Sequence, residues 1–146
     1  MTRLSLIAAL AFALSTAAQA GETPAPPGAR VFFVNVKDGD SVTAPVTVQF
    51  GIEGMALAPA GTETPNTGHH HLLLDRPALG QGPDGAAELD ANIASDEHNI
   101  HFGKGQTEVV LDLTPGPHTL QLVLGDANHI PHNPPVASER ITITVK

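Results

Sequence analysis

The stretch Val46-Thr47-Val48-Gln49-Phe50-Gly51-Ile52 decides the fold, because apolar side chains alternate along it with polar or small ones. Successive side chains of a β-strand point to opposite faces, so this pattern predicts a strand with one buried face. The same alternation returns in Ile141-Thr142-Ile143-Thr144-Val145 near the end of the chain. These two segments predict a protein built from β-sheets that each bury one face.

Working outward from these segments, four more short apolar runs bounded by turn residues are predicted strands, at 31–36, 69–75, 108–113 and 118–124. Thr114-Pro115-Gly116-Pro117 joins the last two and is typical of a hairpin turn. The stretch 80–94 fits a polar loop or a short strand equally well. Because no long amphipathic helical period occurs, we predict an all-β fold, an immunoglobulin-like sandwich of about seven strands, with a small barrel as the alternative.

The first twenty residues have the features of a secretory signal peptide. Arg3 precedes the apolar run Leu4–Leu14, and Ala18-Gln19-Ala20 places small residues at the cleavage positions. The run is shorter than the roughly 20 apolar residues that span a bilayer, so we expect a periplasmic or secreted protein without membrane insertion after cleavage. We predict a signal peptide over 1–20, a flexible Pro-rich tether over 21–30 and one immunoglobulin-like β domain over 31–146.

The composition of the chain excludes several function classes. The absence of cysteine excludes disulfides, thiolate metal sites and cysteine nucleophiles. Five Phe with no Tyr or Trp leave few aromatic faces for stacking on bases. Without Arg3, six basic residues face fifteen acidic ones, a net charge of −9 that repels phosphate backbones. We therefore expect no nucleic-acid partner.

The eight histidines are about three times the ordinary number for a chain of this length. They gather in three short segments, His69-His70-His71, His98 to His101 and His129 to His132, with His118 apart from these. Neutral imidazole is a ligand for Zn²⁺ and Cu²⁺, and a transition-metal site without thiolates depends on it. The pattern predicts a copper or zinc site with nitrogen and oxygen ligands.

The spacing within each segment ranks the candidate ligands. In an ideal strand His69 and His71 share a face about 6.5–7 Å apart, which suits a shared metal only if the strand bends or a neighbouring loop adds a histidine. His-x-x-His spacing lets the imidazoles of 98 and 101, and of 129 and 132, converge within one turn of chain. We predict His71, His101 and His129 as the core ligands, with His69, His98 and His132 as the next candidates.

Other interpretations of the histidines stay open. His70 and His118 share alternation faces with leucines and are predicted to be structural. The remaining six could instead hydrogen-bond to loop carbonyls, or titrate together as a pH sensor. Asp96, Glu97 and Asp126 are candidates to orient imidazoles, or are solvated loop charges. The glycine-rich stretch 103–107 lacks the features of a phosphate-binding loop and is predicted to be a tight turn.

Three longer segments resemble a known family: 68–75 (GHHHLLLD), 101–107 (HFGKGQT) and 116–126 (GPHTLQLVLGD), followed by 129–136 (HIPHNPPV). They resemble the bacterial "domain of unknown function 4399" family, and the resemblance runs from about Val31 to Val145. It implies a small exported protein, immunoglobulin-like in fold, and implies no activity.

From the histidines we expect a non-enzymatic protein that binds a divalent transition metal, copper or zinc, for sequestration or delivery. The alternative is an envelope protein-interaction module whose histidines fix loops. An enzyme is the third option, because three histidine ligands with an open fourth position can activate water. The oligomeric state is left open by the sequence.

Overall fold

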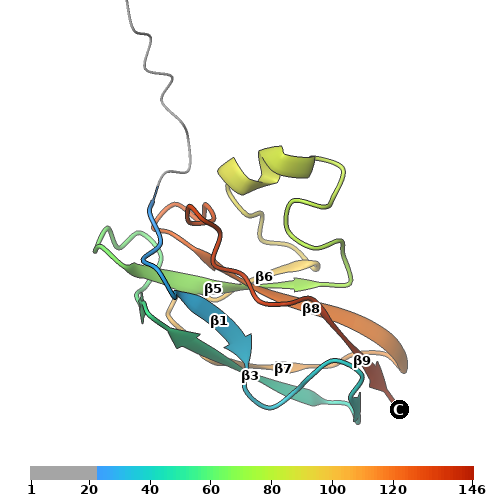
Figure 1. Cartoon of the computed structure of the whole chain (residues 1–146). Helices are drawn as coiled ribbons and strands as arrows, with labels where there is room; N and C mark the ends of the chain where they lie inside the picture. The colour runs from blue at the N-terminus through green and yellow to red at the C-terminus, as the bar shows by residue number, and fades with distance from the viewer. Residues whose placement is uncertain (1–22) are drawn as a thin grey trace, which may run out of the picture.

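The computed structural model describes residues 23–146, which form two β-sheets packed face to face (Figure 1). The predicted signal peptide lies outside the described residues. The elements in chain order are β1 (Arg30–Phe33), β2 (Ser41–Val42), β3 (Val46–Glu53), β4 (Ala56–Leu57), β5 (Thr67–Leu74), the 3₁₀ helix η1 (Gly85–Asp90), β6 (Asn99–His101), β7 (Glu108–Leu111), β8 (Gly116–Gly125) and β9 (Ile141–Val145).

The strand order is that of an immunoglobulin-like sandwich. One sheet has the order β1-β3-β7, and the other has the order β2-β9-β8-β5-β4, with β6 also paired to β5. The three central strands of the larger sheet, β9, β8 and β5, pair antiparallel, while the short β2 adds to β9 in parallel. The predicted all-β sandwich is confirmed. Nine strands are present among the described residues rather than about seven, because β2, β4 and β6 have only two or three residues each.

The predicted hairpin between the runs 108–113 and 118–124 is wrong. β7 pairs with β3 in the smaller sheet, whereas β8 pairs with β5 and β9 in the larger one. The connection around Pro115 therefore crosses from one sheet to the other. Turn residues reverse the chain direction, but they do not determine which sheet the next strand joins.

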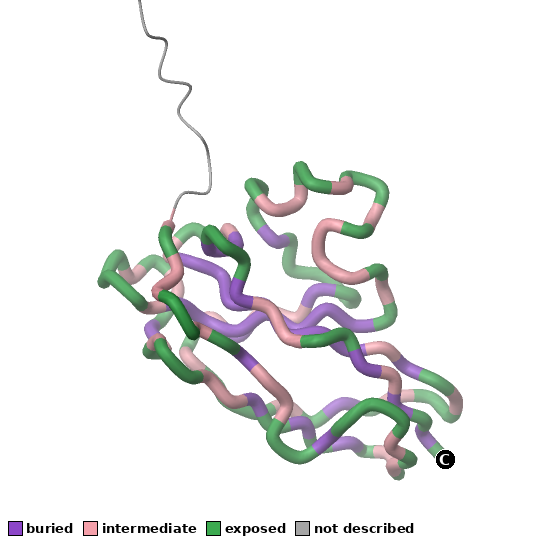
Figure 2. Tube along the Cα trace, viewed as in Figure 1, coloured by how far each residue is buried: buried purple, intermediate pink, exposed green. Residues whose placement is uncertain are grey.

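The main core lies between the two sheets, where the buried trace of Figure 2 follows the strands. β3 contributes Val46, Val48 and Phe50, as its alternation predicts, and its intervening residues are exposed or half-buried. From the larger sheet, β5 contributes Leu72 and Leu74, which face the same interior. The apolar residues of the stretch 46–52 that face the core thus lie on the inner face of the smaller sheet.

The face of the larger sheet that points away from the smaller sheet, here called the outer face, is covered as well. Leu73 and Val123 on this face pack with Ile93, from the excursion over residues 75–98 that carries η1 and lies above the sheet in Figure 1. β5 is consequently buried on both faces from Gly68 to Leu74. Polar side chains on its outer face are shielded from solvent.

The N-terminal segment differs from the flexible tether predicted over 21–30. From Thr23 onward it is bonded to the body of the domain, with the Ala25 N–H donating to the Asn133 carbonyl at 3.0 Å and the Asn133 N–H to the Thr23 carbonyl at 2.9 Å. Arg30 already belongs to β1. Among residues 23–146 no helix has the length and apolar character needed to cross a membrane.

Candidate metal centre

His69 and His71 come from the outer face of β5. They alternate with His70, which points into the core, and each is only 1% exposed. Their Nε2 atoms lie 3.0 Å apart and their ring centroids 4.8 Å apart. The rings therefore converge well inside the ideal spacing of about 6.5–7 Å between residues i and i+2 on one face of a strand.

His101 is placed by strand pairing. β6 runs antiparallel to β5, and His101 lies directly opposite His71 in the register. Its ring centroid is 5.0 Å from that of His71 and 4.9 Å from that of His69. Directly opposed residues on one face of a sheet are neighbours, so the pairing itself brings a third imidazole to the pair.

His129 arrives from the loop after β8, and Asp126 shapes that loop. The Asp126 carboxylate accepts hydrogen bonds from the N–H groups of Asn128 and Ile130 at 2.8 and 3.0 Å. The backbone carbonyl of Asp126 accepts one from the N–H of His129 at 3.0 Å. His129 itself has a φ of +65°, a left-handed conformation that few non-glycine residues adopt. The turn directs its Nδ1 to within 2.9 Å of Nε2 of His69.

Together these side chains form a four-histidine cluster of His69, His71, His101 and His129. One ring nitrogen from each lies within 4.8 Å of the others. A tetrahedral ion with metal–nitrogen bonds of about 2.0–2.1 Å needs its ligand nitrogens about 3.3–3.4 Å apart. The contacts of 2.9 and 3.0 Å and the 4.8 Å limit lie on either side of that spacing.

Two glycines make room for the imidazoles. A Cβ on Gly103 would lie 2.3 Å from Cε1 and 2.6 Å from Nε2 of His101. A Cβ on Gly125, the partner of His69 in the β5–β8 register, would lie 2.7 Å from Nε2 of His71. A side chain at either position would push a cluster nitrogen out of place. The sequence predicts turns at 103–107 and at 125–128, but it does not predict that Gly103 and Gly125 make room for imidazoles. A glycine two residues after a candidate ligand is the available signal for Gly103.

Hydrogen bonds within the cluster do not satisfy its nitrogens. Nε2 of His69 has a nitrogen of His129 at 2.9 Å and a nitrogen of His71 at 3.0 Å, but it carries either one proton or one lone pair. Nδ1 of His71 and Nε2 of His101 are buried without any partner. Buried polar atoms are usually bonded, and an unpartnered group calls for an explanation such as a bound ion.

Burial and mutual proximity lower the pKa of three of the four cluster imidazoles and so favour their neutral form. Burial, and then the proximity of His101 and His129, lowers the pKa of His69 to about 4. Burial and the neighbouring imidazoles lower the pKa of His71 to about 3, and the same causes lower the pKa of His101. A histidine must be neutral to bind a metal ion. These rings therefore keep lone pairs available at pH 7.

The structure does not bring the other two candidate ligands to the cluster. His98 is largely exposed, and its Nδ1 donates to the Leu74 carbonyl at 2.9 Å. His132 is buried with its ring nitrogens 3.2 Å from the carbonyl oxygens of Leu124 and Thr67. Both histidines thus contact backbone carbonyls, which is the alternative to metal binding that the sequence left open for them.

His70 and His118 lie on core faces, as predicted. His70 is fully buried, its ring 5.3 Å from that of Phe50, and neither ring nitrogen has a partner. His118 bonds to Asp75 at 2.7 Å through Nδ1 and to the Thr114 carbonyl at 2.8 Å through Nε2. Burial acts against the charged form of His118, but these hydrogen bonds outweigh burial and raise its pKa.

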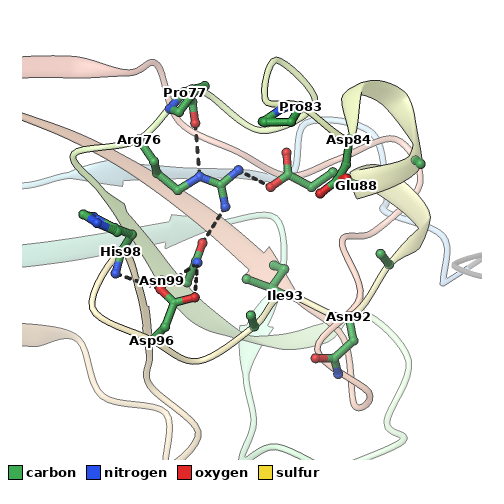
Figure 3. Close-up of a pocket in the computed structure, with 13 residues that line it drawn as sticks. Arg76, Pro77, Pro83, Asp84, Glu88, Asn92, Ile93, Asp96, His98 and Asn99 are labelled. Atoms are coloured by element: carbon green, nitrogen blue, oxygen red, sulfur yellow. Dashed lines mark hydrogen bonds and ion pairs between the residues drawn. The ribbon is translucent and has the colours of Figure 1, made fainter.

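A separate cavity of about 490 Å³ lies under the excursion that carries η1 (Figure 3). Arg76 crosses it, paired with Glu88 and bonded to Asn99 and the Pro77 carbonyl. Because these partners already occupy the guanidinium, the arginine is not free to hold an anion. The cavity includes His98 but none of the four cluster histidines.

Comparison with known proteins identifies the family. The family model described as "Domain of unknown function (DUF4399)" matches residues 48–146, from β3 to the end of the chain. The chain belongs to this family. The resemblance seen in the sequence is confirmed, although the DUF4399 match begins at residue 48 rather than near Val31. All four cluster histidines lie inside the DUF4399 region. A search of curated proteins and a search of solved structures each found no match.

Proposed function

We propose that this protein is a non-enzymatic, exported metal-binding protein that holds one copper or zinc ion on His69, His71, His101 and His129. One observation carries the proposal: three ring nitrogens from β5 and the 126–130 loop meet at 2.9–3.0 Å, a contact that single protons cannot satisfy. One ion at the centre would accept the lone pair of every ring at once. The proposed role is sequestration or delivery of the ion.

The number of donors favours binding over catalysis. A catalytic zinc site typically has three protein ligands and leaves the fourth position to water, whereas a closed site has four. Here four imidazole nitrogens are available, and the two from β5 are 1% exposed. Four ligands on one ion leave no position for a substrate, so we propose no enzymatic activity.

A periplasmic or secreted location fits this proposal. A cysteine-free chain offers only ligands that oxidation does not cross-link, which suits an oxidising compartment. The signal-peptide features of residues 1–20 supply the export step. Cleavage in the native host, detected as an N-terminus near Gly21, is the test of this part.

The metal-binding part is tested by equilibrium dialysis of the full chain, purified without a polyhistidine tag, against Zn²⁺ and Cu²⁺. We expect one ion per chain for the wild type and for His98→Ala, a histidine variant outside the cluster. We expect less than a tenth of that affinity for His71→Leu, which keeps the site apolar and buried. Equal binding by His71→Leu and wild type would overturn the proposal.

The alternative is an envelope interaction module in which the four histidines only hold loops together. The 2.9 Å contact between His69 and His129 favours it, since one imidazole hydrogen bond would tie the 126–130 loop to β5. This alternative predicts no stoichiometric metal in the same dialysis. It also predicts that His71→Leu leaves metal content unchanged while lowering thermal stability.

A further inference from the structure

We infer that the ion this cluster holds most favourably is copper in its Cu(I) state. This inference rests on the proposed function, and it adds the oxidation state and the redox property of the same site. It comes from the charges around the cluster rather than from the ligand type alone.

The ligand set carries no negative charge. All four residues of the cluster are histidines, and no carboxylate belongs to it. His69 and His71 are 1% exposed, while His101 and His129 are half-buried, so an ion held by all four gives up part of its hydration. The cost of moving an ion into such surroundings rises with the square of its charge, which penalises a dication more than a monocation.

One carboxylate lies close enough to matter, that of Asp126. It is 5% exposed, and it lies in the turn that positions His129, whose N–H donates to the backbone carbonyl of Asp126 at 3.0 Å. Its Oδ1 accepts the N–H groups of Asn128 and Ile130, and its Oδ2 accepts the Thr23 hydroxyl at 2.6 Å. With both oxygens engaged, Asp126 contributes a fixed negative charge beside the site without acting as a ligand.

These charges balance for Cu(I) and not for a divalent ion. The Asp126 carboxylate attracts a dication more strongly than a monocation, but it offsets only one positive charge. Cu(I) is then neutralised, whereas Zn²⁺ or Cu²⁺ keeps one positive charge in a partly buried site. Burial and nearby charges both affect the reduction potential of a bound metal ion. The cluster should therefore stabilise Cu(I) relative to Cu(II).

The redox step itself is a one-electron change at the metal. Ascorbate supplies one electron to bound Cu(II), which becomes Cu(I), and ascorbate is oxidised by one electron. The four imidazoles remain neutral ligands, so no protein bond forms or breaks.

The direct test compares the two copper affinities of the untagged full chain. Competition with a Cu(I)-selective chelator under ascorbate gives the Cu(I) Kd, and competition with a Cu(II) chelator in air gives the other. We expect Cu(I) to bind at least about tenfold tighter, which places the midpoint potential at least about 59 mV above that of aqueous copper. Tighter binding of Cu(II) would overturn this inference and leave the proposed function standing. Absence of stoichiometric binding by any of the ions would overturn the proposed function itself.

Asp126→Asn tests the charge argument separately. Asparagine keeps an oxygen for the N–H groups of Asn128 and Ile130, and its amide can donate to the Thr23 hydroxyl, so the loop is preserved. Because a carboxylate attracts Cu(II) twice as strongly as Cu(I) at the same distance, removing its charge weakens Cu(II) binding more than Cu(I) binding. We expect Cu(II) affinity to fall about tenfold more than Cu(I) affinity, raising the potential by about 59 mV.

Thr23→Val is the matched control, because it removes a hydrogen bond to Asp126 and keeps the charge. We expect its ratio of Cu(I) to Cu(II) affinity to equal that of the wild type. An equal shift of the ratio in both variants would mean that loop geometry, not charge, sets the preference, and the inference would fail.

Discussion

Nε2 of His69 lies 2.9 Å from Nδ1 of His129, although the two residues are 60 positions apart in the chain. The contact joins a central strand of the larger sheet to the tip of a loop built around Asp126. It is the shortest nitrogen–nitrogen contact within the four-histidine cluster, so the proposed metal site depends on the conformation of that loop.

His129→Asn tests the contribution of the loop. Asparagine tolerates the left-handed conformation that His129 adopts, so the variant should fold and keep the turn. Three imidazoles would remain, and we expect metal affinity to fall by more than the roughly 10–100-fold that loss of an outer-shell partner costs. Competition titration against a zinc chelator measures the change. Unchanged affinity would show that His129 is not a ligand.

Gly125→Ala tests whether the space beside His71 is part of the site. The new methyl would lie 2.7 Å from Nε2 of His71, and the ring must turn away from its neighbours. We expect metal affinity to fall by about tenfold or more with the β-sandwich retained in far-ultraviolet circular dichroism. Gly82→Ala is the control, because its methyl meets nothing closer than 3.7 Å. If both variants bind metal like the wild type, the close packing around His71 has no role in binding.

His70→Leu should stabilise the protein. Both ring nitrogens of His70 are buried without partners, a state that costs about 1–3 kcal/mol per unsatisfied group and that leucine removes. Burial also lowers the pKa of His70 to about 4, so the folded state binds fewer protons than the unfolded state, and stability is lost as pH falls below about 6.5. We expect the free energy of unfolding to rise by about 1 kcal/mol at pH 7 and by more at pH 5.

Urea unfolding of the two proteins at both pH values measures this effect. His118→Leu is the opposite case, because it discards two hydrogen bonds that are formed, and it should lose stability at neutral pH. A loss of stability in His70→Leu comparable to that in His118→Leu would mean that His70 makes a favourable contribution.

Asp75→Asn should change how stability depends on pH. Hydrogen bonds to Asp75 and to the Thr114 carbonyl raise the folded pKa of His118 despite its burial. This contribution is fully present below the unfolded pKa of about 6.5 and is lost as pH rises through the folded pKa. Asparagine keeps an acceptor for the Thr119 N–H, but it removes the charge and the second carboxylate oxygen, which accepts from Nδ1 of His118. We therefore expect Asp75→Asn to lose about 1 kcal/mol at pH 5.5 and less at pH 8.5. An equal loss at both values would exclude the ion pair as its cause.

Alternation of apolar residues was enough to predict the sandwich. Val48 and Phe50 face the core as their spacing predicts, since a one-residue shift would expose the whole set. The wrong hairpin around Pro115 has a simple cause: the choice between sheets depends on long-range pairing of β7 with β3, which no local residue encodes.

The site could be predicted in part. Periodicity predicts the shared face of His69 and His71, but not the strand pairing that places His101 opposite His71. His69 ranked second because an ideal strand holds it too far from His71, whereas the tilted rings meet at 3.0 Å. His98 is three residues from His101, and His132 is three residues from His129. This spacing allows two rings to meet, yet the rings of His98 and His132 each contact a backbone carbonyl instead. Ring direction in loops depends on tertiary contacts, and spacing alone does not determine it.

X-ray absorption spectroscopy of the untagged chain loaded with one equivalent of Zn²⁺ tests the central claim most directly. Four imidazole nitrogens at about 2.0–2.1 Å, with the multiple scattering of histidine rings, are the predicted first shell. A shell dominated by water or carboxylate oxygen, or one with fewer than three imidazoles, would contradict the assignment of the four-histidine cluster as a metal centre.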